Sequence, residues 1–561
     1  MKYSIFLWFA VITSCSLLAP PLDKAEIRLN QLGYYEGGKK RFIVAEIKGQ
    51  TSFKVIRQSD LAVVLKGELE KGSYSQLSGE TISSGDFSTL ETSGTYFIRI
   101  TGLEDSFPFD ISANVLQDAF KASIKALYFQ RASTGLEAEH AGEYAREQGH
   151  PDRGIPFHSS VEREGTINSA KGWYDAGDYG KYVVNGAYSL GQLLTLVEHY
   201  PDIISDGDLN IPESGNGISD LLDELKYEMD WLLTMQDADG GVFFKVTCEN
   251  FEGMVMPKEA TKQRYVFKES TASTLDFAAV AAKFSRAYSS FDADYAQKCL
   301  ESAEKAWEWA LENPAIAFKN PKGVVTGEYG DENFTQEFFW AAAELYVSTG
   351  DQAYLDYQKD LQINFNFLPG ASWANHVHYL GAFALIDHGN DSTVEAQMKE
   401  TIVSLSDHLI TGMKLESYYQ PVKNFQWGSN SDVMNTAYIL AQAYRIIGDK
   451  KYLSAVQEIT DYVFGKNAVG YSFVTGFGTR TPLHIHHRPS EGDDILEPIP
   501  GFLAGGANFS KQDKWGAWYS EPSFEMTSWV DHKNSYASNE ICLNWNAPLS
   551  YVLGFLEEES N

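Results

Sequence analysis

Cysteine, positive charge and long apolar runs are all scarce in this chain of 561 residues. Its four cysteines are widely spaced, so neither a disulfide framework nor a CxxC metal site is expected. Lysine and arginine total 45 against 76 aspartates and glutamates, and the formal net charge of −31 repels nucleic acid phosphates and anionic lipid headgroups. Nucleic acid is therefore excluded as a partner. The 43% of apolar residues is ample for a core, and this length predicts a small domain plus a large one.

The N-terminus carries an apolar run at residues 3–12, which follows the single cation Lys2 and is too short to span a bilayer. This layout is typical of a secretory signal. The ending Ile12-Thr13-Ser14-Cys15 resembles a bacterial lipobox, so we predict a lipoprotein-type signal peptide over residues 1–15, with Cys15 lipidated. Plain signal cleavage with an incidental Cys15 is the alternative. We expect an exported monomer, in the periplasm or as an outer-membrane lipoprotein, that touches a membrane only through its lipid.

Residues 24–112 break into short β-rich runs separated by Gly, Ser and Asp. In one of them Tyr96, Ile98 and Ile100 alternate with Phe97, Arg99 and Thr101, as on a half-buried strand. The size and pattern predict an immunoglobulin-like β-sandwich.

Residues 115–561 show helical periodicity instead, with stripes of apolar residues three and four apart. Two turns are alike, since Gly350-Asp351 and Gly448-Asp449 can each end one helix and cap the next. Repeated hairpins of this kind suit an (α/α) barrel, with an open solenoid as the alternative. We predict helices near residues 115–133, 181–200, 218–236, 270–291, 294–313, 336–349, 374–389, 394–411, 431–447, 450–465 and 537–557.

Two acidic motifs lie far apart in the helical part. The loop WYDAGDYGK, residues 173–181, sets Asp175 and Asp178 around a glycine, and Glu540 lies near the other end in an expected helix. Glycoside hydrolysis with inversion needs one carboxylate to activate water and one protonated carboxyl to assist the leaving group. Asp175 and Asp178 suit the first task, and Glu540 suits the second if Trp529, Tyr536 and Trp545 surround it. Taken singly, the aspartates could instead form a calcium or turn-capping loop, and Glu540 an exposed helix charge.

Between these motifs, residues 472–488 form a glycine-rich turn followed by His484, His486, His487 and Arg488. Imidazole and guanidinium groups could bind sugar hydroxyls, and Arg488 could hold a carboxylate in place. Zinc binding by the three histidines is the rival interpretation, although no cysteine or HExxH helix accompanies them.

These motifs, in this order, resemble those of the family 9 glycoside hydrolases, the inverting cellulase family in which an (α/α)6 barrel often follows an immunoglobulin-like domain. The resemblance covers nearly the whole mature chain and includes Ser472, Val474, Thr475, Gly478 and Arg480, then His486 and Arg488, then Trp529, Asp531, Tyr536, Glu540 and Asn546-Ala547.

The resemblance implies a role for each site residue. Asp178 would be the general base, Asp175 would help to hold the water, and Glu540 would be the general acid. His486 and Arg488 would contact the sugar, and Asp531 would support their network. Trp427 would be a cleft aromatic, with a core tryptophan as the alternative. Tyr536, His487 and Trp173 complete the predicted substrate-binding set.

Two departures from the family concern metals. Gln336-Glu337 stands where many relatives carry Asp-Glu near a structural calcium ion, which leaves both a calcium-bound and a calcium-free site open. No Cys/Cys/His cluster precedes the DAGD loop, so structural zinc is not expected, and no cofactor is required.

The leading hypothesis is an inverting endo-β-1,4-glucanase acting on cellulose-like glucans, which include cellodextrins, mixed-linkage glucan and the xyloglucan backbone. An exo-acting cellodextrinase or exo-glucosaminidase is the runner-up, and it requires residues 134–172 to block one side of the cleft. A non-catalytic glycan-binding lipoprotein has no need for a separated acid and base. A lyase or epimerase would have to use His486 or Tyr536 as its base.

Overall fold

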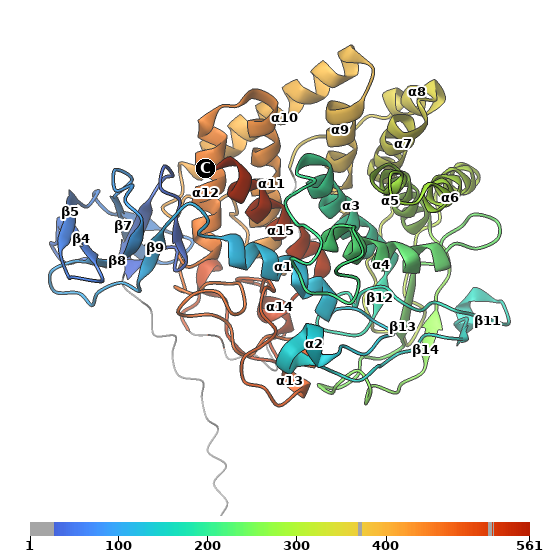
Figure 1. Cartoon of the computed structure of the whole chain (residues 1–561), viewed down its shortest axis with the longest axis horizontal. Coiled ribbons are helices and arrows are strands. Elements are labelled where there is room, and N and C mark those ends of the chain that lie inside the picture. The colour runs from blue at the N-terminus through green and yellow to red at the C-terminus, as the bar shows by residue number, and fades with distance from the viewer. Residues whose placement is uncertain (1–26, 368–372, 514–518, 520, 561) are drawn as a thin grey trace, which may run out of the picture.

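The structure is a computed structural model that describes residues 27–367, 373–513, 519 and 521–560. The predicted signal peptide and Cys15 lie outside the described residues. A small β domain stands beside a larger helical domain (Figure 1).

The β domain is a sandwich of two sheets, as the alternating pattern predicted. Tyr96, Ile98 and Ile100 are buried inside it, whereas Arg99 and Thr101 face solvent. One sheet has the order β1 (Ile27–Arg28), β3 (Arg41–Ala45), β7 (Glu80–Asp86), β6 (Ser73–Ser75); the other has β2 (Gly33–Tyr34), β9 (Phe109–Ile111), β8 (Gly94–Arg99), β4 (Ser52–Arg57), β5 (Val63–Glu68). All strand pairs within the two sheets are antiparallel except β2 with β9.

The helical domain is an (α/α)6 barrel, as predicted. Within the described residues, six helices form an inner ring and six others of similar length lie outside it. The inner helices are α3 (Val183–His199), α5 (Thr271–Tyr288), α7 (Thr335–Thr349), α9 (Val377–His388), α11 (Ser429–Ile447) and α15 (Leu543–Glu559). The outer helices are α1 (Gln117–Phe129), α4 (Asp220–Thr234), α6 (Ala293–Glu312), α8 (Gln352–Asp360), α10 (Ser392–Met413) and α12 (Lys450–Val463).

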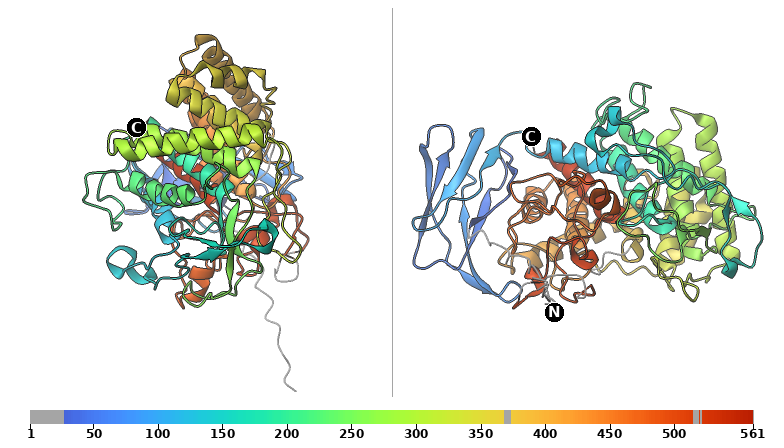
Figure 2. Two further views of the ribbon diagram at one scale, coloured as in Figure 1. Left: turned by 90° about the vertical axis from the view of Figure 1, so that its right-hand side faces the viewer. Right: turned by 90° about the horizontal axis from the view of Figure 1, so that it is seen from below.

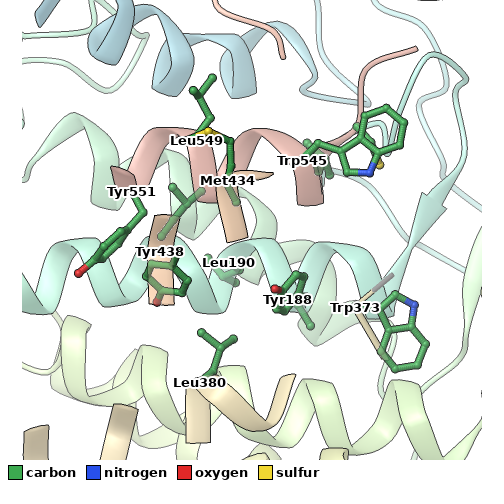
Figure 3. Packing of buried hydrophobic residues seen from close by; sticks show 14 of the residues in the cluster. Tyr188, Leu190, Trp373, Leu380, Met434, Tyr438, Trp545, Leu549 and Tyr551 are labelled. Carbon is green, nitrogen blue, oxygen red and sulfur yellow. The ribbon is translucent and has the colours of Figure 1, made fainter. Parts of the chain in front are cut away.

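Burial distinguishes the two rings. Helix α3 is buried continuously from residue 183 to 196 and α11 from 429 to 443, whereas outer helices such as α6 bury one stripe. A helix that is buried on every side belongs inside a large core. Side chains of α3, α9, α11 and α15 meet there, including Tyr188, Leu380, Tyr438 and Leu549 (Figure 3).

The two similar turns have the predicted caps. Gly350 and Gly448 adopt positive φ angles of 73° and 68°, and the carboxylates of Asp351 and Asp449 accept N–H bonds from the first turns of α8 and α12. The prediction for Glu540 was wrong, because this residue is extended (φ −74°, ψ 163°) between α14 (Tyr536–Asn539) and α15. Its backbone pairs with His486 and so cannot continue a helix.

The sandwich packs against the barrel at α12 and the neighbouring loops (Figure 2). The buried guanidinium of Arg28 donates to both carboxylate oxygens of Glu80 and to the hydroxyl of Tyr418, each at 2.8 Å. Asn30 donates to Asp461 of α12 at 3.0 Å. These buried polar contacts fix the orientation of the two domains.

Long connections gather at one end of the barrel, the lower end in Figure 1. They include α2 (Ala138–Ala141), α13 (Arg488–Gly492), α14, β10 (Ile155–Pro156), β11 (Thr166–Ile167), β12 (Lys181–Tyr182), β13 (Lys245–Cys248), β14 (Arg264–Val266) and the 3-10 turns Gly142–Tyr144, Ser159–Val161, Trp373–Asn375 and Glu525–Thr527. Inner helices α3, α7, α11 and α15 begin directly after such connections, so the positive ends of their dipoles point to this end. No helix of the described part is long and apolar enough to cross a membrane.

Candidate active site

Backbone pairing joins three distant segments at the lower end of the barrel. Ala176 in the DAGD loop forms an antiparallel bridge with Cys542, and the N–H of Leu543 donates to the carbonyl of Asp175 at 2.9 Å. His486 forms a parallel bridge with Glu540. The two acidic motifs and the histidine segment therefore form one site.

Gly177 lies where the three segments meet. Its N–H binds the carboxyl group of Glu540, and its carbonyl accepts from the N–H of Arg488 at 3.1 Å and from Arg488 Nη1 at 2.6 Å. A Cβ atom here would lie 1.9 Å from the carbonyl oxygen of His486. Glycine is thus required by close approach of backbones and not by an unusual φ angle.

Asp175 is buried behind the loop and is 1% exposed. Its two carboxylate oxygens accept from Asn185 Nδ2 at 2.9 Å and from the Tyr329 hydroxyl at 2.7 Å. Burial, and then the charge of Asp178, raises the pKa of Asp175 to about 7, while these two hydrogen bonds oppose the rise.

Asp178 and Glu540 share one cavity of about 450 Å³, which Asp175 does not line. Asp178 is oriented by the N–H of Gly180, which donates to Oδ2 at 2.9 Å. Burial, and then repulsion from Asp178, raises the pKa of Glu540 well above its usual value, with Arg488 opposing. The cavity therefore presents a carboxyl group that retains its proton and a second carboxylate held by the backbone.

Aromatic side chains line the same cavity. Trp427 is 40% exposed there, and its ring lies 5.3 Å from that of Tyr536. This position fits the cleft aromatic that was predicted and not a core tryptophan. The cavity is lined by Ala176, Asp178, Tyr182, Phe251, Gly327, Glu328, Tyr329, Gln426, Trp427, Glu540, Cys542, Asn544 and Trp545.

Comparison with known proteins identifies the family. The profile described as "Glycosyl hydrolase family 9" matches residues 117–553, and "Cellulase N-terminal ig-like domain" matches residues 23–105. The chain belongs to glycosyl hydrolase family 9. It is 39% identical over 579 aligned residues to the xyloglucan-specific endo-β-1,4-glucanase of Bacteroides ovatus, covering 98% of this chain and 97% of that one.

Two further relatives support this family assignment. Endoglucanase D of Acetivibrio thermocellus is 34% identical, covering 96% of this chain and 84% of its own length. The solved structure "Bacteroides ovatus GH9" superposes with a TM-score of 0.88 at 37% identity, covering 96% and 99% of the two chains. This family 9 hydrolase is thus matched to its relatives across both domains.

Three predicted residues of the hydrolase hold the site together. Asp531 accepts the N–H groups of Leu483 and His484, both at 2.8 Å, so it fixes the histidine segment without lining the cavity. His486 bonds through Nδ1 to the carbonyl of Lys533 at 2.6 Å, and burial lowers its pKa to about 4. Arg488 holds Gly177.

Trp427 is the predicted substrate-binding residue that lines the cavity. His486, Arg488 and Tyr536 lie beside the site without lining the cavity, and Trp173 and His487 are buried away from it. Trp173 is 1% exposed and donates through Nε1 to Glu224 at 2.8 Å. His487 is fully buried, and its ring nitrogens lie 2.9 Å from Ser490 Oγ and 3.0 Å from Gln130 Oε1. A buried side chain whose polar atoms are already paired cannot reach a sugar, so both are assigned to supporting the loops. Of the aromatic residues expected around Glu540, Trp545 lines the cavity and Trp529 packs instead against Tyr471 and Phe473.

Calcium binding near Gln336-Glu337, which the family likeness left open, stays a prediction. Gln336 Oε1 lies 2.8 Å from His378 Nδ1. Burial, and then the charges of Asp276 and Asp331, raises the pKa of Glu337 well above its usual value. Burial, and then the charge of Asp331, does the same to the pKa of Asp276. In the described part of the chain, no three His, Cys, Asp or Glu side chains converge as metal ligands. His484 lies 3.6 Å from Glu491, and His487 faces Gln130 and Ser490. Catalysis in this family needs no cofactor.

Tyr329 is a site residue that the sequence analysis missed. It lies in Gly327-Glu328-Tyr329-Gly330, an aromatic and acidic turn between glycines that is similar in kind to the DAGD loop. That similarity could have identified it. Phe251 and Trp545 line the cavity without any comparable local pattern.

Proposed function

We propose that this family 9 hydrolase is an endo-acting, inverting β-1,4-glucanase whose substrates include the xyloglucan backbone. The name of the Bacteroides ovatus relative supports xyloglucan as the first substrate to test. One observation supports inverting hydrolysis: Asp178 and Glu540 line the same cavity, and Asp175 is buried behind it.

In the proposed reaction, Asp178 removes a proton from a water molecule. The water oxygen attacks the anomeric carbon on the face opposite the leaving group as the glycosidic bond breaks, and Glu540 gives its proton to the departing oxygen. The raised pKa of Glu540 keeps that proton available near neutral pH. Asp175, held by Tyr329 and Asn185, does not line the cavity, so it acts on the water only through the loop that it shares with Asp178.

Endo action is supported by the walls of the cavity. Residues 134–172, which the exo alternative requires as a barrier, contribute none of the residues that line it. Internal cleavage of a polymer lowers viscosity early, whereas end trimming releases small sugars with little change in viscosity. Viscometry on xyloglucan and barley glucan, with product sizes recorded, separates the two.

The acid and base assignments are tested by Asp178→Ala and Glu540→Gln. Each should lower kcat by about 10²- to 10⁴-fold, and the matched surface variant Glu308→Gln on α6 should not. NMR of the first product should show the α anomer. Activity retained in Asp178→Ala, or a β product, would refute the mechanism. Tight binding of cellohexaose without cleavage by the wild type would support a lectin instead.

A further inference from the structure

Lys245 is a fully buried cation beneath the base loop, with no role in the mechanism above. It lies on β13, where its backbone pairs with Tyr182 of β12, four residues after Asp178. Its ammonium group lies 4.9 to 5.5 Å from the ring centroids of Phe267, Phe318 and Tyr182. A buried ammonium is costly unless its charge and its donors are used.

The hydrogen bonds of Lys245 all reach one neighbouring segment. Nζ donates to Asn320 Oδ1 at 2.7 Å and to the carbonyl of Gly327 at 2.6 Å, with Thr326 Oγ1 at 3.5 Å. The N–H of Gly327 in turn donates to the Tyr182 hydroxyl at 3.0 Å. Two residues further on, Tyr329 donates to Asp175. Lys245 is thus connected to Asp175 through the backbone that carries Tyr329.

The Lys245 ammonium is held by these hydrogen bonds and not by a contact ion pair, since no carboxylate of the described residues lies against it. Burial lowers the pKa of Lys245 to about 7, and the charges of Asp178 and Glu328 oppose this. Replacing the lysine therefore removes the donors that hold Asn320 and Gly327 in place.

We propose that Lys245 is a positioning residue for the loop that carries the catalytic base: its ammonium holds the 320–329 segment so that the Tyr329 hydroxyl stays bonded to Asp175. The proposal rests on the base role proposed above for Asp178. Because variants are compared with the wild type on whichever glucan it cleaves, the proposal does not depend on the preferred substrate.

Three variants test this role. Lys245→Met removes the donors, and we expect kcat to fall by about 10- to 100-fold, as for a misplacement near 1 Å. KM should change little, because Lys245 does not line the cavity. Lys245→Gln keeps a donor for Gly327, so its kcat should recover in part. Lys283→Met is the matched control, since Lys283 is a buried lysine of α5 that pairs with Glu198 and Glu344.

Lys283→Met should lower the melting temperature without changing kcat. All assays are made well below each melting temperature, on protein whose circular dichroism matches the wild type. A wild-type kcat in Lys245→Met would overturn the proposal, as would a kcat in Lys245→Gln no higher than in Lys245→Met. Activity retained in Asp178→Ala would instead refute the base assignment itself, which distinguishes the two failures.

Discussion

Replacing Gly177 by alanine tests whether backbone contact between the three segments sets the catalytic geometry. The added Cβ would lie 1.9 Å from the carbonyl oxygen of His486, and real Cβ contacts below 3.0 Å essentially do not occur. The obstructing atom is backbone, so no side chain can rotate away. The DAGD loop and the His486 segment must therefore separate by about 1 Å, a displacement that can cost about 10²-fold in rate.

The same displacement reaches both catalytic carboxyl groups. The Gly177 amide binds Glu540 and its carbonyl binds Arg488, while Asp178 is the next residue. We therefore expect kcat/KM to fall by about 10²-fold, with a loss of roughly 1–3 kcal/mol in the free energy of unfolding from overpacking.

The assay is release of reducing ends from xyloglucan, with melting followed by calorimetry. Gly412→Ala is the control, because a Cβ at this position in α10 meets nothing within 4 Å. It should leave kcat/KM unchanged and stabilise the protein by up to about 1 kcal/mol. Wild-type kcat/KM in folded Gly177→Ala would refute the reasoning that this contact positions the acid and base.

Further outcomes can be checked separately. Tyr329→Phe removes the hydroxyl that binds Asp175 Oδ2, so kcat should fall by about tenfold with little change in KM; an unchanged kcat would contradict the support given to Asp175. Burial raises the pKa of Glu228 to about 8. The protonated Glu228 carboxyl therefore stabilises the fold fully below the pKa that Glu228 has in the unfolded chain, and this stabilisation is lost as pH rises through 8. In Glu228→Gln the free energy of unfolding, measured with urea from pH 5 to 8, should therefore depend less on pH, by up to about 1.4 kcal/mol per pH unit. The same pH dependence in the variant and the wild type would argue against a raised pKa for Glu228. Cys15→Ala should abolish incorporation of labelled palmitate during expression in a bacterium and release the protein from membranes; labelling that persists would exclude Cys15 as the lipidated residue.

The repeating parts of the fold could be predicted because their patterns are local. The apolar stripes predicted the inner helices and the outer helices except α8, which only the expected cap at Asp351 indicated. Asp449 marked a second cap. Glu540 was misplaced because residues 536–546 contain helix formers on both sides of it. What makes it extended is pairing with His486, more than fifty residues away, which no local pattern reports.

The burial of individual site residues could not be predicted from the sequence either. Trp173 and Trp427 are both aromatic residues in glycine-containing loops, yet one is 1% exposed and the other 40%. Lys245 interrupts an apolar stretch from Val242 to Val246 and carries no mark of its contacts with Gly327. Such roles depend on which segments fold back over one another.

The division of labour among the three acids follows from where each one finds hydrogen bonds. Asp175 receives two donors but no solvent, and burial still raises its pKa to about 7. Glu540 has a backbone donor and a nearby guanidinium, yet burial and the charge of Asp178 raise its pKa well above the usual range. Because Asp178 contributes to both shifts, neutralising it should lower both pKa values. In Asp178→Asn the alkaline limb of any residual activity should therefore move to lower pH, as Glu540 loses its proton more readily. A displacement in the opposite direction would show that repulsion between Asp178 and Glu540 does not keep the acid protonated.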